Sequence, residues 1–315
     1  MTDTTYWDPE LRAALDLARA ELPATITPDL IPLLQETSAR TEQAMADLSA
    51  RFGVGLRGYP VEAGLEVVVA RPPQAGPRAP VLYFVHGGGM IMGSAVFGLD
   101  LVLPWAVELG ALVVSVDYRL APQFPDPIPA QDCFAGLRWV LAHAGELDAD
   151  PSRIVLVGHS AGAGLAAGLA QRVRDTDGPA LRGQLLMCPM LDDRERTPSS
   201  VELDGDGVWD RTSNRTGWTA LLGDRRGGPD VPAYAAPARA RDLAGLPPAY
   251  LDVGSAEVFR DEVADYASRI WQAGGAAELH VWPGAYHCFE IVAPESQLGR
   301  AARAARIAWL RRVIA

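Results

Sequence analysis

Short apolar segments alternate with helix-like stretches over most of the chain. From about residue 61 onward, runs of Val, Leu and Ile are separated by stretches whose apolar residues recur every three or four positions. Strands that are apolar throughout are typical of a mostly parallel sheet covered by helices on both faces. The expected strands are residues 61–70, 81–85, 111–116, 154–157, 184–187, 249–253 and 278–282, and the expected helices are residues 130–144, 161–174, 261–273 and 299–314. Ligands bind such sheets at the carboxyl ends of the strands, so candidate chemistry is sought there.

Two segments depart from this alternation. The first 50 residues show helical spacing, as at Leu11, Leu15, Ala18 and Leu22, and contain several prolines that start or interrupt helices. Residues 191–246 are rich in Asp, Arg, Gly and Pro, and they are too many for a simple loop. We therefore expect a helical N-terminal cap segment (residues 1–55) and a main α/β domain (56–315) that carries a cap insertion at about 191–246.

Composition and charge exclude several classes of protein. The chain has 315 residues, of which 49% are hydrophobic and 21% charged, a balance typical of globular proteins. Its formal net charge of −11 argues against a nucleic-acid partner and against a surface that binds anionic membranes. No basic start leads into an apolar run, and no stretch of 18 apolar residues occurs, so we expect a cytoplasmic protein without stable membrane insertion.

The strongest motif is Gly-His-Ser-Ala-Gly at residues 158–162, between an expected strand and an expected helix. In this context it predicts a nucleophile elbow, a turn so tight that side chains at Gly158 or Gly162 would clash. Ser160 would then be exposed at a helix N-terminus, and the N–H of Ala161 would be available to a developing negative charge. A plain structural turn is the alternative.

A second motif, His-Gly-Gly-Gly at residues 86–89, ends the expected strand 81–85. Three glycines let the backbone turn several N–H groups toward one point, where they can hold an oxyanion. A flexible turn is the alternative. We expect His86 to form a hydrogen bond within its own loop rather than act as a base.

One of the five histidines is the best candidate for a base. His287 lies in a loop just after the last expected strand, whereas His143 and His280 lie within expected elements, and His159 is the variable position of the elbow. An acid that orients this base is expected between Ser160 and His287 along the chain.

Three acids follow or lie within the expected strand 249–253. Glu257 is preferred because it lies in the loop after that strand. Asp252 would lie inside the strand, and Asp261 would begin the next helix. A solvated loop position is the further alternative for Glu257.

Two weaker signals predict no cofactor and no metal. Residues 162–167 fit a Gly-x-Gly-x-x-Ala dinucleotide pattern, but no acidic residue ends a second strand about 20 residues later, so the glycines are better explained by close helix packing. Cys133, Cys188 and Cys288 match neither a zinc ribbon nor a disulfide framework, and they are expected to be core or near-core thiols.

These motifs together resemble the hormone-sensitive-lipase branch of the α/β hydrolases, the bacterial family IV esterases that carry the His-Gly-Gly-Gly motif. The resemblance covers roughly residues 60–315 and extends to Asp-Tyr-Arg-Leu-Ala-Pro at 117–122, Glu-Val-Phe-Arg-Asp-Glu at 257–262 and His-Cys-Phe at 287–289. This sequence has His159 where the family usually has aspartate before the serine, and Glu257 where the family's acid is usually aspartate.

The resemblance implies an α/β-hydrolase fold in which residues 56–315 form the catalytic domain. It implies a serine esterase for short-to-medium acyl esters that uses Ser160, Glu257 and His287, has Gly87, Gly88 and Ala161 as oxyanion donors, and needs no cofactor. Hydrolysis of lactones, amides or formamides by the same triad, or ligand binding without catalysis, is the alternative.

Aromatic residues in the two cap segments suggest a lid over the acyl site. Tyr6, Trp7, Trp209 and Trp218 are expected to contribute to it, with ordinary core or surface positions as the alternative. The candidate substrate-contacting residues are Met90, His159, Trp209 and Trp218. The partner is thus expected to be a small-molecule ester, and the C-terminal strand and helix are where a homodimer would form.

Overall fold

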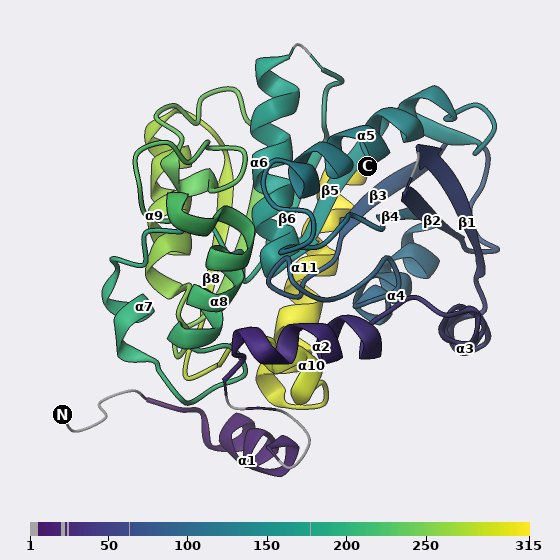
Figure 1. The fold of residues 1–315 in the computed structure, drawn as a ribbon. Helices are drawn as coiled ribbons and strands as arrows, with labels where there is room; N and C mark the ends of the chain where they lie inside the picture. Colours follow the sequence, from purple (N-terminus) through teal and green to yellow (C-terminus); the bar gives the residue numbers. More distant parts are fainter. Residues whose placement is uncertain (1–5, 20–22, 24, 63, 177) are drawn as a thin grey trace.

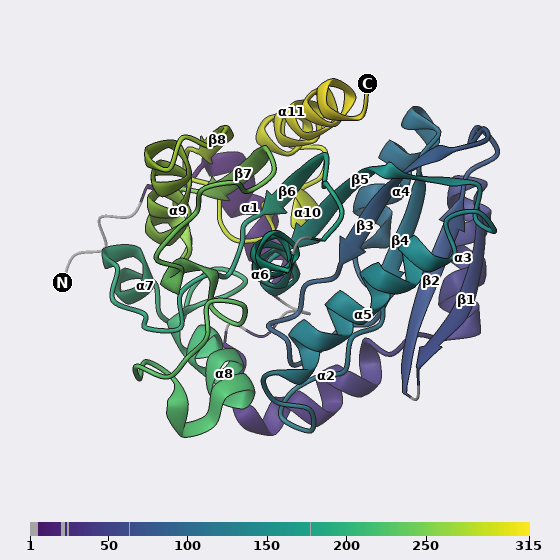
Figure 2. The ribbon, with the colours of Figure 1, turned by 90° about the horizontal axis from the view of Figure 1, so that it is seen from above.

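An eight-stranded sheet crosses the molecule and carries helices on both faces (Figures 1 and 2). The computed structural model describes residues 6–19, 23, 25–62, 64–176 and 178–315. The spatial order of the strands is β1-β2-β4-β3-β5-β6-β7-β8. Their bounds are β1 Gly55–Glu62, β2 Leu65–Arg71, β3 Ala79–Val85, β4 Leu112–Val116, β5 Ala149–His159, β6 Gly183–Met187, β7 Ala249–Gly254 and β8 Ala277–Trp282.

The six strands from β3 to β8 are parallel, as the apolar pattern predicted, but the first part of the sheet differs from the prediction. The expected single strand at residues 61–70 is wrong, because β1 and β2 form an antiparallel pair in which Glu62 faces Leu65. The chain reverses at Gly64, whose φ of +77° lies in the left-handed region that favours glycine. Apolar residues on both sides of this turn gave the appearance of one continuous strand.

The sheet is buried because alternate side chains pack against different helices. Tyr83 of β3 belongs to a core with α5 and α6, whereas its neighbours Leu82 and Phe84 pack with α4 and α11 on the opposite face. The helices are α1 Pro9–Ala18, α2 Ile31–Thr37, α3 Glu42–Phe52, α4 Leu99–Leu109, α5 Ile128–Ala142, α6 Ala161–Asp175, α7 Pro198–Glu202, α8 Arg211–Leu222, α9 Arg260–Gln272, α10 Phe289–Val292 and α11 Gln297–Ile314. None of the helices in the described part of the chain combines the length and apolar character that a membrane span requires.

Part of the N-terminal segment contacts the insertion, whereas helix α3 of that segment lies beside β1 and α4 at the other end of the sheet (Figure 1). Arg12 of α1 donates to Asp206 of the insertion at 2.7 Å, and Arg19 pairs with the same carboxylate. Leu22, which belonged to the predicted helical pattern, lies outside the described residues.

A small third core joins α1 to the C-terminal part of the chain. Leu11 and Leu15 of α1 are buried against Tyr286 and Phe289. The backbone N–H of Asp8 also donates to the carbonyl of Gly284 at 3.0 Å. The start of α1 is therefore attached to the loop that follows β8.

Candidate active site

Ser160 stands on the sharp turn between β5 and α6. Its φ of +56° and ψ of −122° form a backbone conformation that only the surrounding structure can enforce on a non-glycine residue. A Cβ on Gly162 would lie 2.2 Å from the carbonyl oxygen of Val85, and one on Gly158 would lie 2.4 Å from Ala163 Cα. Both glycines are therefore required by close backbone approach, as predicted for an elbow.

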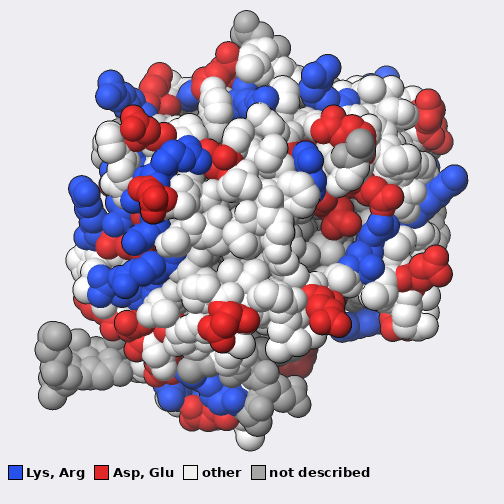
Figure 3. Space-filling view, in the orientation of Figure 1, with Lys and Arg blue, Asp and Glu red and all other residues white. Residues whose placement is uncertain are grey.

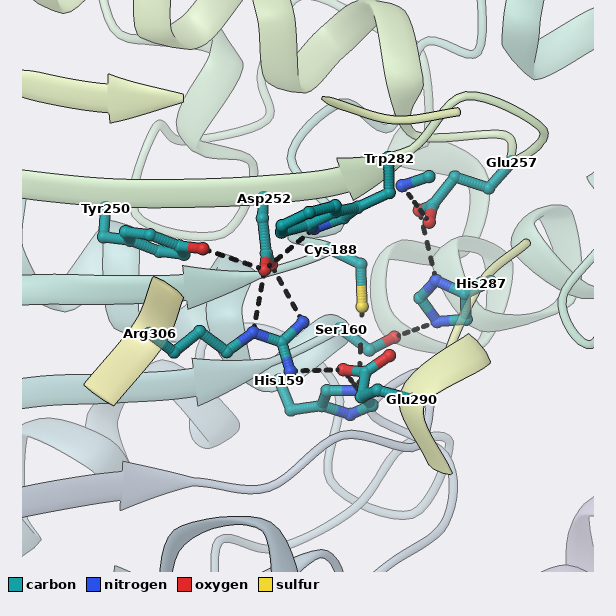
Figure 4. A network of polar contacts seen from close by, with 11 residues as sticks. His159, Ser160, Cys188, Tyr250, Asp252, Glu257, Trp282, His287, Glu290 and Arg306 are labelled. Atoms are coloured by element: carbon teal, nitrogen blue, oxygen red, sulfur yellow. Dashed lines mark hydrogen bonds and ion pairs between the residues drawn. The ribbon is translucent and has the colours of Figure 1, made fainter. Parts of the chain in front are cut away.

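His287 lies in the loop between β8 and α10, where its ring reaches the serine (Figure 4). Ser160 Oγ lies 2.8 Å from His287 Nε2. Both side chains are buried, and the ring edge of Phe259 packs against the imidazole with centroids 5.1 Å apart. This geometry lets the hydroxyl donate its proton to the imidazole when the serine attacks an electrophile.

Glu257 completes a continuous chain of hydrogen bonds. Its Oε1 lies 3.2 Å from His287 Nδ1, and its Oε2 accepts from the N–H of Gly254 at 2.9 Å. Glu257 is only 2% exposed, so it is not a solvated loop residue. The carboxylate fixes the imidazole tautomer in which Nδ1 carries the proton and Nε2 faces the serine.

The two other candidate acids have different partners. Asp252 forms a buried ion pair with Arg306 of α11, at 2.7 Å between Oδ2 and Nε. Asp261 accepts from the backbone N–H of Ser199 and pairs with Arg260. Neither contact involves His287.

The charge of this site favours a protonated imidazole. Burial alone lowers the pKa of His287, but the neighbouring Cys188 and the Glu257 carboxylate raise it, and the net pKa lies above its ordinary value. The imidazolium that forms when Ser160 gives up its proton is therefore stabilised. We attribute this to Glu257, because burial raises the pKa of the Cys188 thiol and so keeps that group neutral near pH 7.

Unpaired backbone donors surround the serine. Among the described residues, none accepts a hydrogen bond from the N–H groups of Gly87, Gly88 or Ala161. A Cβ on Gly87 would lie 3.3 Å from Ser160 Cβ, which places this backbone against the serine. Gly88 has a φ of +103°, which a residue with a side chain rarely adopts. The arrangement offers donors to an anion that forms beside Ser160.

His86 stabilises the glycine loop. Its Nδ1 donates to the carbonyl of Gly87 at 2.8 Å, and its ring stacks on Tyr118 with centroids 4.1 Å apart. Burial lowers the pKa of His86 to about 4, so the ring is neutral near pH 7. The expected hydrogen bond within its own loop is present.

A cavity of about 330 Å³ opens beside Ser160 and His287. Its walls are mostly apolar and come from the N-terminal segment, the glycine loop, the insertion and α10. The lining residues are Pro23, Ile26, Leu34, Gly88, Gly89, Met92, Phe97, His159, Ser160, Val208, Trp209, His287, Cys288, Ile291 and Val292.

Only some of the aromatic and apolar candidates from the sequence line this cavity. His159 and Trp209 do, and the Trp209 ring packs on Gly89, where a Cβ would lie 2.3 Å from it. Trp218 and Met90 are not among the lining residues, and both are almost completely buried in the main core. Tyr6 is 63% exposed, and Trp7 packs on Tyr286 in the third core.

The N-terminal segment contributes residues to the cavity wall that no sequence motif predicted. Ile26 and Leu34 lie in its wall, although neither belongs to a motif. Apolar spacing in the first 50 residues identified helices but could not distinguish the side facing a ligand from the side facing the core. Met92 and Phe97 also line the cavity, and their position shortly after the glycine motif is the signal that could have identified them.

Comparison with known proteins adds independent information. A family model described as alpha/beta hydrolase fold matches residues 81–291. The carboxylesterase NlhH of Mycobacterium tuberculosis (strain CDC 1551 / Oshkosh) is 34% identical over 305 residues, which cover 93% of this chain and 94% of that protein.

Two solved structures are similar over almost their full length. A bacterial heroin esterase is 36% identical, with a TM-score of 0.88 and coverage of 100% of both chains. The esterase LipW from Mycobacterium marinum is 35% identical, with a TM-score of 0.87 and coverage of 98% of this chain and 96% of that one.

Proposed function

The chain belongs to the hormone-sensitive-lipase-like branch of the alpha/beta-hydrolase fold family, and from this premise we propose that it is a serine carboxylesterase that cleaves short-to-medium acyl esters through an acyl-enzyme. The observation that carries the proposal is the hydrogen-bonded chain Ser160–His287–Glu257, with 2.8 Å and 3.2 Å between successive polar atoms. It lies beside the apolar cavity, where a carbonyl carbon can approach the serine oxygen.

The reaction divides into two acyl transfers. Ser160 Oγ attacks the ester carbonyl while His287 Nε2 takes the hydroxyl proton. The tetrahedral intermediate then collapses, the C–O bond to the alcohol breaks, and His287 returns the proton to the leaving alcohol. Water next gives a proton to His287 and attacks the acyl carbon, which releases the acid and restores Ser160. Glu257 holds the imidazole and stabilises its cation in both steps.

The oxyanion of each tetrahedral intermediate is assigned to the N–H groups of Gly87, Gly88 and Ala161. Their lack of partners among the described residues supports this role, because these donors need no rearrangement before they bind the anion. Loss of one such donor typically costs about 3 kcal/mol of transition-state stabilisation.

The substrate class follows from the cavity. Its apolar wall and volume of about 330 Å³ fit an acyl chain of short-to-medium length rather than a polymer or a charged acyl group. We assign residues 1–55 and 191–246 to a cap over the catalytic domain (56–315), because Ile26 and Leu34 from one segment and Val208 and Trp209 from the other enclose the same cavity.

A labelling experiment tests the nucleophile. We expect a fluorophosphonate probe to label wild-type protein and the Ser115→Ala variant, but not Ser160→Ala. Ser115 is the matched control because it is also buried, in β4, away from the elbow. On p-nitrophenyl esters of increasing chain length, Ser160→Ala should lose kcat by at least about 10⁴-fold. Normal turnover by this variant, or faster cleavage of an amide than of its matched ester, would contradict the proposal.

A homodimer through β8 is the oligomeric state that we propose. This strand is last in the sheet, so its outer edge has no partner strand in the described part of the chain. Val281 of β8 is 43% exposed and Trp271 at the end of α9 is 48% exposed. Sedimentation should give a dimer mass for the wild type and a monomer for Val281→Arg, because a buried unpaired charge opposes association. If the wild type and Val281→Arg sedimented with the same mass, this interface would be excluded.

A further inference from the structure

Three soft ligand groups gather directly behind the nucleophile. An imidazole nitrogen of His159, Cys188 Sγ and Cys288 Sγ all lie within 4.8 Å of one another. Figure 4 shows the Cys188 sulfur pointing toward His159, and the two atoms are 3.6 Å apart. The residues come from three places in the fold, namely the end of β5, the position after β6 and the residue before α10.

The contact between His159 and Cys188 is a hydrogen bond in the metal-free protein, and its length also suits two ligands of one metal ion. Zinc binds imidazole nitrogen at about 2.0 Å and thiolate sulfur at about 2.3 Å, so a tetrahedral site places the two donors roughly 3.6 Å apart. The observed separation of His159 Nε2 and Cys188 Sγ has this value. Cys288 Sγ lies within 4.8 Å of the other two ligand atoms, so a movement on the order of 1 Å would bring it to the same separation.

The cluster also has an entry path and a nearby negative charge. His159 and Cys288 line the cavity beside Ser160, so an ion can reach them from the substrate side. Glu290 Oε1 lies 3.7 Å from His159 Nε2 and also forms a buried ion pair with Arg306 Nη1 at 2.8 Å, so its charge is shared between the two neighbours. With three protein ligands, a fourth position stays open to water or to this carboxylate.

We propose that His159, Cys188 and Cys288 form a binding site for a thiophilic divalent cation such as Zn²⁺, and that its occupancy inhibits the esterase. On binding, each thiol releases one proton to solvent and its sulfur donates an electron pair to the cation, while the imidazole binds through neutral Nε2. No electron transfer is involved, and a chelator reverses the reaction.

Inhibition follows from where the ligands are attached. His159 immediately precedes Ser160 in the chain, and Cys288 immediately follows His287. Contraction of the three donors around an ion therefore displaces the backbone at both residues of the 2.8 Å Ser160–His287 hydrogen bond. A misplacement of about 1 Å between reacting groups is enough to lower turnover about 100-fold. This half of the proposal rests on the proposed esterase function, whereas metal binding does not.

Binding is tested without enzyme activity. Cd²⁺ is added to the full chain with its thiols kept reduced, and the ultraviolet absorption of thiolate-to-metal charge transfer is recorded. We expect saturation at one ion per chain, and an affinity about 100-fold lower in Cys188→Ser and in Cys288→Ser, since each variant loses one of three ligands. Cys133→Ser is the matched control, because Cys133 is also a buried thiol but lies in α5 outside the cluster. Circular dichroism shows whether each variant is folded. Cys188→Ala removes the same ligand and takes the place of Cys188→Ser if the serine variant does not fold.

Inhibition is tested with Zn²⁺ and a p-nitrophenyl ester. Turnover of the wild type and of Cys133→Ser should fall in step with occupancy and return after chelation, whereas Cys188→Ser should need about 100-fold more Zn²⁺. The site is overturned if the absorption is missing from the wild type or is unchanged in both cluster variants. The inhibitory role is overturned if Cd²⁺ and Zn²⁺ bind without loss of turnover. Failure of the esterase proposal can be told apart from failure of the metal site. In that case the metal-free protein would hydrolyse no ester, while the charge-transfer absorption would still appear when Cd²⁺ is added.

Discussion

At the scale of single residues, three buried acids near the carboxyl end of β7 have different tasks. Glu257 faces His287, Asp252 neutralises Arg306, and Glu262 accepts the backbone N–H of Leu191 at 2.7 Å. All three are at most 3% exposed, so burial does not distinguish the residue that orients a base from one that stabilises the fold. Their partners do.

The Glu257→Gln variant should change both the rate and its pH dependence. His287 must be neutral to accept the serine proton, and the Glu257 carboxylate helps to raise its pKa above the ordinary value. Wild-type kcat/KM should therefore decline as pH falls through this raised pKa. In Glu257→Gln the acidic limb should move to lower pH, while the maximal rate falls by roughly 10⁴-fold. The full pH profile of kcat/KM is the measurement.

Asp252→Asn is the control for that profile. Removing one partner of a buried ion pair typically costs about 3 kcal/mol in the free energy of unfolding, which denaturant titration measures. The acidic limb should stay where it is in the wild type, because Asp252 does not contact His287. If the acidic limb moved in Asp252→Asn but not in Glu257→Gln, Asp252 and not Glu257 would be the acid that orients His287.

The sequence predicted the residues of the hydrogen-bonded chain because each one belongs to a motif or follows a strand. Ser160 sits in the elbow, and His287 and Glu257 lie in loops after expected strands. Cys188 also follows a strand, yet nothing in its neighbourhood indicated a ligand, since its partners are 29 and 100 positions away. Trp209 and Trp218 belong to the same buried core, and only tertiary packing decides that Trp209 also lines the cavity.

At the scale of elements, the elbow depends on how closely α6 approaches β3. The Gly162→Ala variant should lose about 3 kcal/mol of unfolding free energy, because its Cβ would lie 2.2 Å from the carbonyl oxygens of both Val85 and His86. Turnover should fall as well, since this backbone leads into the glycine motif at residues 86–89. Gly145→Ala is the control, because no atom outside its neighbours lies within 4 Å of that Cβ. Equal stability of the two variants would contradict the packing argument.

The elements that were predicted and those that were missed differ for a physical reason. Strands such as β5 and helices such as α6 contain their expected ranges and extend beyond them by a few residues at most of their ends. They could be predicted because burial favours apolar residues at many successive or regularly spaced positions. Helix α4 was not predicted, and it contains Pro104, which normally interrupts a helical pattern. The β1–β2 hairpin was missed because its apolar residues continue through the turn.

At the scale of the whole molecule, arginine is the residue that carries the basic charge. The sequence contains no lysine, so all 28 basic residues are arginines. Acidic and basic side chains lie near one another around the margin of the face seen in Figure 3, whose centre is mostly uncharged. Arginine pairs also link distant segments, as Arg12 does with Asp206 and Arg306 does with Asp252 and Glu290. Pairing across segments therefore helps to hold helices α1 and α11 in place.

The third core makes the base depend on a peripheral helix. Tyr286 and Phe289, on either side of His287, are packed with α1 and not with the two cores of the sheet. Helices of this kind open at lower free energy than a central sheet. Ester turnover assayed during heating should therefore disappear at a lower temperature than the circular dichroism of the sheet. Coincident midpoints would mean that α1 does not detach separately.

The bond from Asp8 to Gly284 gives this dependence a practical meaning. A warmed sample that has lost ester turnover but kept its circular dichroism would have a folded sheet from which α1 has detached. Cooling should then restore turnover without refolding of the sheet. A more heat-tolerant variant would then be obtained by strengthening the contact between α1 and the loop after β8 and not by repacking the sheet.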